Sequence, residues 1–443
     1  MAVVCSWSVV ACSAQQDSSS TEPVESDAKP LQFSWDMQSG KTIHFLTYKH
    51  PWSDAIQASL GEFTELTGIK VEMEVVPEQQ ARQKLAVEMA AGGVAVDVFF
   101  TSLHVEKKLY SAANWYQDLK AYMDNPLLTS PDYDYEDFFE GARNGAATDQ
   151  GTITAMPLNI SPFIFYYRKD LFEQAGLTPP TTLQQVREYA ELLHNPPEVY
   201  GFVNRGLRNA NVTTWSFALR SMGGSYFEQD GVTPALNTPA AIRATEWYAG
   251  LLRDYGPPGA INFNWNESIS IFGQGKAAMS YDSSDLVVQL EDPDKSKVVG
   301  RVGYMLVPPD EETGISDHNN GLNALAISNG SKNKEAAWLF IQWATGKEMT
   351  LKAQLAGVYL SRASAYQNEQ FVQTNKMPKE YVETTQEALR LSEPNLLPDV
   401  KNVSEYRDIV GLEVQTVVGG MEVTSAMERA QKNILSFMRK DSQ

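Results

Sequence analysis

Cysteine is almost missing from this chain of 443 residues. The two that are present, Cys5 and Cys12, lie close to the N-terminus, and none follows them. Proteins of oxidising compartments either use disulfides or avoid cysteine, and the long cysteine-free part of this chain fits the second habit. The same scarcity excludes a cysteine nucleophile from that part.

Positive charge and long apolar runs are scarce as well. Lys and Arg number 36 against 55 Asp and Glu, which gives a formal net charge of −19. An acidic surface repels nucleic acid and anionic lipid headgroups, so we expect neither as a partner. No segment beyond the N-terminal region has the roughly 18 consecutive apolar residues of a membrane-spanning helix. We therefore expect any contact with a membrane to run through a covalent lipid.

Signatures of catalysis and of metal binding are missing too. There is no GxSxG elbow and no phosphate-binding glycine loop in the right setting, and no histidine pair has HExxH spacing. A glycosidase needs two carboxylates at a set separation, and nothing singles out such a pair among 55 acidic residues. We expect no catalytic residue, no cofactor and no metal, with a secreted glycan-active enzyme as the less favoured alternative. The scattered histidines are His44, His50, His104, His194 and His318.

The N-terminal region has the pattern of a processing segment. Residues 3–11 are apolar and small, and Val9-Val10-Ala11-Cys12 resembles the lipobox of bacterial lipoproteins, whose cysteine is diacylated. Signal peptides have Lys or Arg before their apolar stretch, and here neither residue precedes it. Residues 15–30 are too polar to fold and are predicted to form a flexible tether. We interpret residues 1–40 as signal remnant and tether, with lipidation at Cys12 and an extracytoplasmic location, in the periplasm or on the outer face of the cytoplasmic membrane.

Strand and helix patterns alternate from residue 41 onward. Strand patterns at 42–47, 69–75 and 94–100 are separated by helical spacing at 54–67 and 79–91, which predicts a parallel sheet flanked by helices. A single core stops growing near about 250–300 residues, so we expect two lobes. Further strands are predicted at 156–167, 277–281, 303–307 and 324–327. Further helices are predicted at 169–175, 183–193, 215–222, 239–255, 334–345, 347–354, 409–417 and 425–438.

Several stretches resemble one known family. MPL at 156–158 followed by YYRKDLFEQAGL at 166–177, FGQGKAAM at 272–279 and SKNKEAAWLFI at 331–341 are similar, in order and spacing, to motifs of extracellular solute-binding proteins. These proteins belong to bacterial ABC importers, and the similar group binds maltodextrins, other oligosaccharides and polyols. The similarity runs from about residue 41 to 438.

The resemblance implies an α/β fold, a two-lobed periplasmic-binding-protein clamshell with helix-flanked, mostly parallel sheets. Lobe one would hold residues 41–151 and 320–374, and lobe two residues 152–319 and 375–443. A ligand would bind in the cleft between them, at the C-terminal ends of strands.

The resemblance also implies a function. The protein would capture a sugar, oligosaccharide or polyol as a monomer and deliver it to the transmembrane subunits of an ABC permease. Ferric-iron-binding relatives use tyrosine pairs, so Tyr166-Tyr167 keeps open a non-sugar solute such as iron or an amine. In this chain the pair belongs to the family motif, which favours core packing.

Sugars present hydroxyls at their edges and apolar C–H faces, so their sites combine short polar side chains with aromatic rings. Tyr48 and Trp52 follow the first predicted strand and are candidates for ligand contacts or for covering the core. Thr101 and Ser102 follow the third strand, where their hydroxyls would reach a ligand or cap the next helix.

Further candidates come from the resemblance. Asn159 and Ser161 lie where the chain crosses between lobes, and Asn320 and Gly321 lie where it returns. Gly321 would let the backbone approach the ligand closely. Trp215 is predicted to open a helix.

Tyr281 and Asp282 follow a predicted strand, where a carboxylate can accept from two sugar hydroxyls, or else form a surface salt bridge. Arg362 lies in an element that in the family usually has Pro before this Arg, and here the Pro is missing. Tyr406 is predicted to lie in a loop before the helix at 409–417. The remaining tryptophans singled out, Trp247, Trp265, Trp338 and Trp343, are expected in the core.

Overall fold

The structure is a computed structural model that describes residues 1–4, 32–148, 150–356, 358, 361–392 and 396–441. Contacts divide the chain into residues 1–32 and 33–443, and the second unit contains every helix and strand discussed below. Cys5 and Cys12, with the predicted lipidation, lie outside the described residues. Within the described part, no helix is both long and apolar enough to cross a membrane.

The first strands form as their patterns predict. β1 (Thr42–Tyr48) pairs in parallel with β2 (Lys70–Val76) and β3 (Val98–Ser102). On β2, residues alternate between exposed and half-buried, because only one face of this edge strand packs on the core. The helices between and after these strands are α1 (Pro51–Thr67), α2 (Glu78–Ala90) and α3 (Leu103–Ala112).

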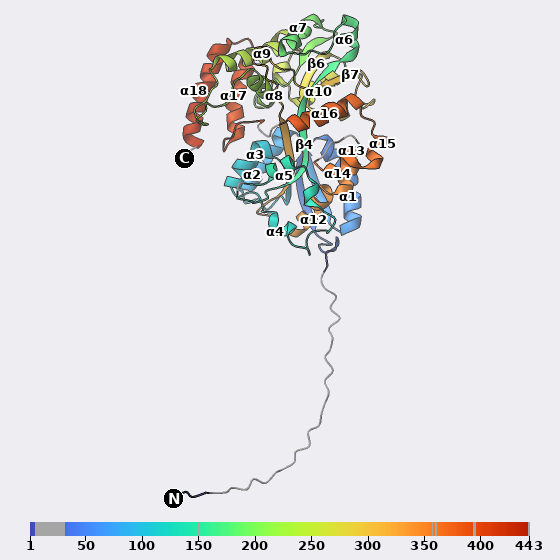
Figure 1. Ribbon diagram of the computed structural model, residues 1–443, viewed down its shortest axis with the longest axis vertical. Helices are drawn as coiled ribbons and strands as arrows, with labels where there is room; N and C mark the ends of the chain where they lie inside the picture. The colour runs from blue at the N-terminus through green and yellow to red at the C-terminus, as the bar shows by residue number, and fades with distance from the viewer. Residues whose placement is uncertain (5–31, 149, 357, 359–360, 393–395, 442–443) are drawn as a thin grey trace. The chain divides into compact units, whose positions relative to one another are not determined.

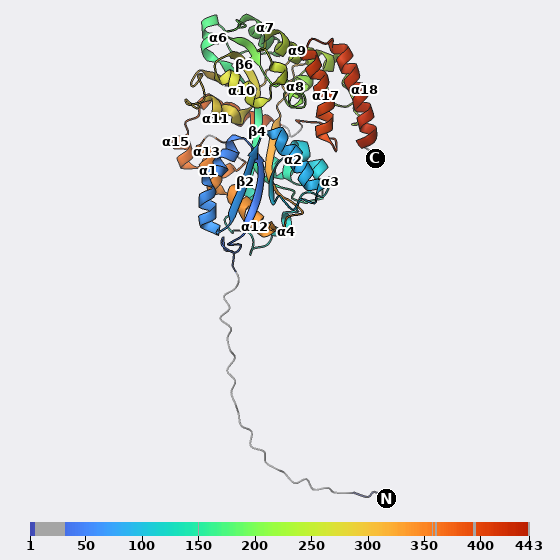
Figure 2. The ribbon, with the colours of Figure 1, turned by 180° about the vertical axis from the view of Figure 1, so that it is seen from behind.

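One long strand connects two groups of strands (Figures 1 and 2). β4 (Met156–Arg168) is buried along its whole length. Its first half pairs with β8 (Asn320–Ile327) up to Pro162, which places it beside β1, β2 and β3. From Phe163 onward it pairs with β6 (Ala277–Ser283) and β7 (Val302–Met305), and β6 in turn pairs with β5 (Tyr200–Val203). The path of the sheet is β2-β1-β3-β8-β4-β6-β5.

The sheet is more mixed than the sequence suggested. β1–β2, β1–β3 and β5–β6 are parallel, whereas the pairs β3–β8, β4–β8, β4–β6 and β4–β7 are antiparallel. The expectation of mostly parallel strands therefore holds at the two ends of the sheet and is wrong at its centre. The reason is that β4 leads the chain from the first group of strands to the second and β8 brings it back. The two strands lie side by side and therefore run in opposite directions.

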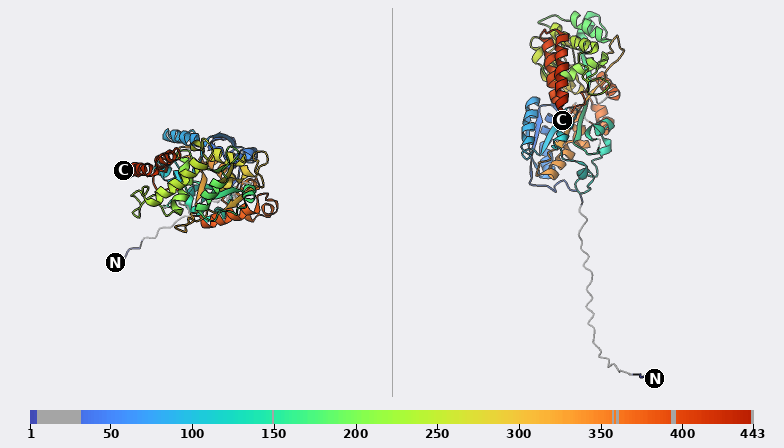
Figure 3. Two further views of the ribbon diagram at one scale, coloured as in Figure 1. Left: turned by 90° about the horizontal axis from the view of Figure 1, so that it is seen from above. Right: turned by 90° about the vertical axis from the view of Figure 1, so that its left-hand side faces the viewer.

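Helices cover both groups of strands. Around the second group lie the α7–α9 and α17–α18 helices, with α17 and α18 running side by side (Figure 3). Their bounds are α6 (Lys169–Ala175), α7 (Leu183–Leu192), α8 (Ala210–Ser221), α9 (Pro239–Tyr255), α10 (Trp265–Gly273), α16 (Lys379–Leu391), α17 (Val403–Val418) and α18 (Val423–Asp441). The helices that belong with the first group are α12 (Lys334–Ala344), α13 (Lys347–Leu355), α14 (Ala363–Gln367) and α15 (Glu369–Thr374).

Separate hydrophobic clusters pack on the two strand groups. Phe45 and Trp338 belong to a cluster on β1, β3 and α12, and Phe165 and Trp247 to a cluster on β4, α8 and α9. This separation is what a two-lobed molecule requires, although the lobe boundaries themselves stay a prediction. The structure puts the passage of the sheet from one group to the other at Pro162 and Phe163, inside β4.

Candidate functional site

A polar cavity lies where the ends of several strands and helices from both groups come together. Its empty volume is about 570 Å³, a value that includes the part that opens to solvent. From the first group come ends of β1, β3, α2 and α3, and from the second group the segments after β5 and β6 and the starts of α10 and α17. The lining residues include Tyr48, His50, Glu78, Arg82, Ser102, His104, Ser161, Phe163, Arg205, Thr213, Trp265, Asp285, Gly321, Asn323 and Arg407.

Two arginines of the cavity are held by carboxylates. Arg82 donates from Nη2 to Glu78 Oε1 at 3.0 Å and to Ser102 Oγ at 3.0 Å, and forms a second ion pair with Glu106. Burial by itself raises the pKa of the Glu78 carboxyl. The charges of Arg82, Arg205 and Arg407 outweigh burial and hold that pKa at about 2. Glu78 is therefore ionised at neutral pH.

Arg205 is oriented from behind by Asp282. The guanidinium donates from Nε to Asp282 Oδ2 at 2.8 Å and from Nη2 to Oδ1, the bidentate geometry that fixes an arginine best. Asp282 is 1% exposed and does not line the cavity, whereas Arg205 does. The expectation that Asp282 itself contacts a ligand is thus corrected, since both of its oxygens are occupied by Arg205.

Asp285 is a cavity carboxylate held by neutral donors. Its Oδ2 accepts from Asn159 Nδ2 at 3.1 Å and from Ser161 Oγ at 3.0 Å, and His50 Nε2 lies 3.4 Å away. Its Oδ1 is buried and has no hydrogen-bond partner among the described residues. Burial lowers the pKa of His50, against the pull of Asp285, so this imidazole is neutral at pH 7.

Arg407 is the third cavity arginine, and it has neutral partners only. Its Nε donates to the Asn209 carbonyl at 3.1 Å and its Nη2 to Thr213 Oγ1 at 2.8 Å. Among the described residues no carboxylate forms an ion pair with it, although it is only 4% exposed. Burial, and then the charge of Arg82, lowers the pKa of Arg407 to about 9.

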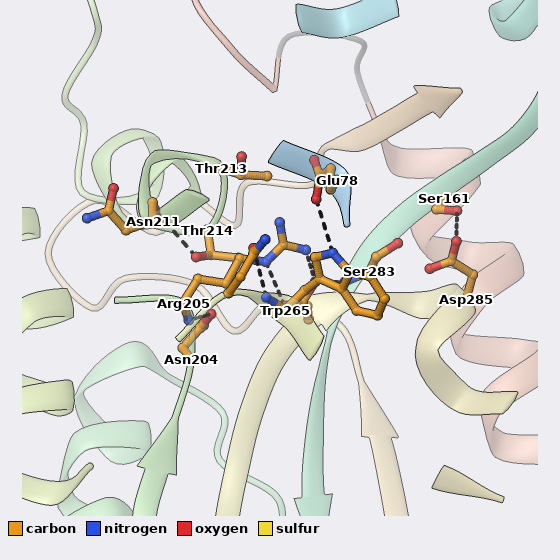
Figure 4. Close-up of polar contacts among 12 residues, drawn as sticks. Glu78, Ser161, Asn204, Arg205, Asn211, Thr213, Thr214, Trp265, Ser283 and Asp285 are labelled. Atoms are coloured by element: carbon orange, nitrogen blue, oxygen red, sulfur yellow. Dashed lines mark hydrogen bonds and ion pairs between the residues drawn. The ribbon is translucent and has the colours of Figure 1, made fainter. Parts of the chain in front are cut away.

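Trp265 supplies an aromatic wall and corrects the expectation that it lies in the core. The ring is half-buried at the start of α10, and its Nε1 donates to Glu78 Oε2 at 3.1 Å. Figure 4 shows the indole in the middle of the cluster, with Arg205 and Thr213 on one side and Asp285 with Ser161 on the other. A polar bond therefore joins α2 of the first group to α10 of the second across the cavity.

His104 forms a neutral part of the wall, next to Gly321. Its Nδ1 lies 3.2 Å from the Leu322 amide nitrogen, and burial lowers the pKa of the imidazole to about 3. A Cβ at Gly321 would come within 3.3 Å of the His104 ring. Glycine at 321 therefore lets the ring and the backbone approach each other closely.

The structure brings four of the residues predicted for the site to the cavity: Tyr48, Ser102, Ser161 and Gly321. Three others lie one layer behind it. Trp52 stacks on Phe100 at 4.7 Å between ring centroids, and Thr101 donates to Glu106 Oε2 at 3.0 Å. Asn159 is fully buried and supports Asp285 and Asn323.

Three further candidates are corrected because they lie in the core. Trp215, Tyr281 and Tyr406 are 0% exposed. α8 begins at Ala210, so Trp215 lies in mid-helix and donates from Nε1 to Thr245 Oγ1 at 3.0 Å. α17 begins at Val403, so Tyr406 lies within the helix and not in a loop before it.

Arg362 and Asn320 are also corrected. Arg362 is 0% exposed, its guanidinium donates to carbonyl groups and to Asp137, and it does not line the cavity. Asn320 donates from Nδ2 to Ser392 Oγ at 2.8 Å and does not line the cavity.

The residues that sequence reasoning missed had usable signals. Glu78 and Arg82 follow β2 with helical i, i+4 spacing, and Asp285 follows β6, so the rule about strand ends that selected Tyr48 applies to them equally. Arg205 follows β5, a four-residue strand that the sequence analysis did not recognise. Arg407 directly follows Tyr406, which was selected from the sequence.

No cluster of three or more His, Cys, Asp or Glu side chains able to hold a metal ion occurs in the part of the chain that the structure describes.

Comparison with solved structures defines the class of fold. The structure superposes with a TM-score of 0.82 on an ABC transporter solute-binding protein from Agrobacterium radiobacter in complex with ribitol, at 26% identity over 92% of this chain and 100% of that one. It superposes with a TM-score of 0.80 on a solute-binding protein from Agrobacterium vitis with bound D-mannitol, also at 26% identity, covering 90% and 99%. The α/β fold is that of periplasmic binding proteins.

The family follows from sequence. Residues 50–350 match the family of bacterial extracellular solute-binding proteins, and the chain belongs to this family, whose members bind solutes and are not enzymes. It is 28% identical to the erythritol/L-threitol-binding protein of Mycolicibacterium smegmatis over 90% of this chain and 86% of that protein. It is 30% identical to the mannitol-binding protein of Pseudomonas aeruginosa over 77% and 76%.

Proposed function

We propose that this protein captures a small polyol or sugar outside the cytoplasmic membrane, as the binding component of an ABC importer. The observation that carries the proposal is the cavity lining, which combines guanidinium groups, carboxylates and hydroxyls with the half-buried ring of Trp265. The relatives that bind erythritol, mannitol and ribitol support the same chemical class.

Hydroxyl groups match this lining because each can donate one hydrogen bond and accept others. A ligand hydroxyl can accept from Arg205 or Arg407 and donate to Asp285, whose Oδ1 has no partner among the described residues. Bonds of this kind to a charged group are stronger than bonds between neutral partners. The C–H face of the same ligand would pack on Trp265 and Phe163.

Ligand binding would draw the two strand groups together. Glu78 and His104 come from the first group, and Trp265 and Asp285 from the second, so one small molecule would contact both. A ligand that bridges two lobes favours the closed arrangement over the open one. With lobes at residues 41–151 and 320–374, and 152–319 and 375–443, the closed form would dock on transmembrane permease subunits.

The proposal extends to the N-terminus. A lipid on Cys12 followed by the polar segment 15–30 would tether a monomeric binding unit to the outer face of the membrane. If Cys12 is acylated in a bacterial host, we expect the wild-type protein to partition into the detergent phase in a phase-separation assay. The Cys12→Ser variant should stay in the aqueous phase.

Titration calorimetry on residues 33–443 tests the binding function. We expect erythritol, ribitol or mannitol to bind with heat, and maltose, a polyamine and ferric citrate to bind weakly or not at all. Asp282→Asn should weaken binding of the same polyol by about tenfold, because Arg205 loses its bidentate anchor. Asp254→Asn is the control, since Asp254 also pairs with arginines but lies at the surface. Equal affinity in both variants, with native melting curves, contradicts the site.

A further inference from the structure

The cavity has one arginine without an anionic partner. Arg82 is paired with Glu78 and Glu106, and Arg205 is paired with Asp282. Arg407 is the most deeply buried of the three, at 4% exposed, yet among the described residues it donates only to the Asn209 carbonyl and the Thr213 hydroxyl. Buried charges are normally paired, because an unpaired one loses its hydration without compensation.

The position of Arg407 is fixed by its surroundings. Asn209, whose carbonyl accepts from Arg407, has a positive φ of 74°, which is uncommon for a residue other than glycine. α17 can approach this backbone because residue 411 is glycine: a Cβ there would come within 2.6 Å of the Asn209 nitrogen. The local structure thus holds the guanidinium at the cavity wall at the expense of backbone strain.

The electrostatic surroundings of Arg407 favour a negative group. Burial and the neighbouring charge of Arg82 lower its pKa to about 9, which means that its charge is poorly compensated by the protein. At pH 7 it is nevertheless protonated. A further anion next to it would offset both burial and repulsion.

The other side of the cavity has a different character. Thr213, which accepts from Arg407, lies on one side of Trp265, and Asp285 lies on the other (Figure 4). Asp285 has an unoccupied oxygen that accepts from a hydroxyl donor. A ligand that spans the cavity would therefore place hydroxyl groups at Asp285 and its most electron-rich oxygens at Arg407.

We propose that Arg407 makes this cavity a site for a hydroxylated carboxylic acid, an aldonate in which a carboxylate replaces the terminal CH2OH of a polyol. This inference rests on the proposed function and narrows it. The carboxylate forms a charge-assisted hydrogen bond with the guanidinium of Arg407, and the hydroxyl chain extends past Trp265 to Asp285. A neutral polyol fits the same path with a weaker contact at Arg407.

The test compares two probes of equal carbon number, ribitol and sodium D-ribonate, by titration calorimetry at constant ionic strength. Ribonate is expected to bind wild type at least about tenfold more tightly than ribitol, the difference expected between a charged and a neutral partner for one guanidinium. In Arg407→Met the preference should vanish, mainly through loss of ribonate affinity. Arg407→Lys, which keeps the charge, should retain part of the preference.

Arg208→Met is the matched control. Arg208 is an exposed arginine next to the same segment, paired with Asp408, and its removal changes the net charge by the same amount without touching the cavity. It should leave the ratio of the two affinities unchanged. Ribitol binding as tightly as ribonate in wild type, or equal losses for both probes in Arg407→Met, overturns the inference and leaves the proposed function standing. If neither probe nor any other polyol binds wild type, the proposed function falls as well.

Discussion

Two arginines of this molecule are almost equally buried and have opposite surroundings. Arg362, at 0% exposed, donates to the Thr345 carbonyl at 2.6 Å and the Tyr133 carbonyl at 2.8 Å, pairs with Asp137 at 3.2 Å, and lies over the ring of Phe138. Arg407, at 4% exposed, has two neutral acceptors and lines the cavity. The guanidinium of Arg362 is surrounded by protein partners, whereas part of the guanidinium of Arg407 faces the cavity.

The difference separates structural from functional burial. Burial of an arginine does not by itself indicate a binding role. A buried arginine whose donors all bond to the protein, such as Arg362, holds segments of the fold together. A buried charge with unused hydrogen-bonding capacity in a cavity is costly to maintain, and a ligand is what would complete it. The same contrast holds for Asp137, which is occupied by Arg362 and Ser364, and Asp285, which keeps a free oxygen.

The largest expected effect is on stability and concerns Arg362, the structural arginine of the two. Arg362→Met removes the cation of a buried pair, so Asp137 keeps only its hydrogen bonds from Ser364, and the carbonyls of Thr345, Asp134 and Tyr133 lose their donor. We expect the free energy of unfolding to fall by about 3–5 kcal/mol, measured by urea denaturation. Arg187→Met, at an exposed pair with Asp254, should change it by less than about 0.5 kcal/mol. The affinity of the folded fraction for its polyol should be unaltered, and a selective loss of affinity would show that Arg362 acts on the site after all.

An intermediate effect concerns the neutral histidine of the cavity. Burial lowers the pKa of His104 to about 3, against about 6.5 in an unfolded chain, so the unfolded state binds a proton first as pH falls. Stability is therefore full above pH about 6.5 and is lost below it. The loss from this group should reach about 2 kcal/mol between pH about 7.5 and about 5.

His104→Gln should flatten the pH dependence of stability over that interval. Glu78, whose pKa is lowered to about 2, contributes stability that is lost only below pH about 4.5, so the two effects are separated in pH. Urea titrations of wild type and variant at several pH values between about 5 and 7.5 measure the slope. Equal slopes would mean that His104 takes up a proton in the folded cavity.

Much of the fold was predictable from sequence because its signals are local. The strand at β1, the helix that Gly68 ends and the alternation along β2 follow from residues within one element. The antiparallel centre of the sheet was not predictable, since β4 and β8 meet only through the return of the chain after more than 150 residues.

The site was partly predictable for a related reason. Knowing that ligands bind at strand ends selected Tyr48 and Ser102, but which side of a helix faces the cavity depends on where the helix begins. α17 begins at Val403, capped by the Asn402 side chain, so Tyr406 points into the core. The next residue, Arg407, is turned by about 100° around the helix axis and reaches the cavity. An error of a few residues in a helix start therefore exchanges a core residue for a site residue.

The smallest expected effect extends the comparison of cavity and core to two tryptophans, Trp265 at the cavity and Trp215 in the core. Trp265→Phe keeps an aromatic wall but removes the bond from Nε1 to Glu78, which should weaken polyol binding by about three- to tenfold, about 1 kcal/mol, at unchanged melting temperature. Trp215→Phe removes a bond of the same kind, to Thr245, from the core, and should lower the melting temperature without changing affinity. Calorimetry and thermal melts on both variants give a crossed pattern if cavity and core are assigned correctly. If Trp215→Phe were the variant that loses affinity, the ring selected from sequence would lie closer to the ligand than the cavity lining implies.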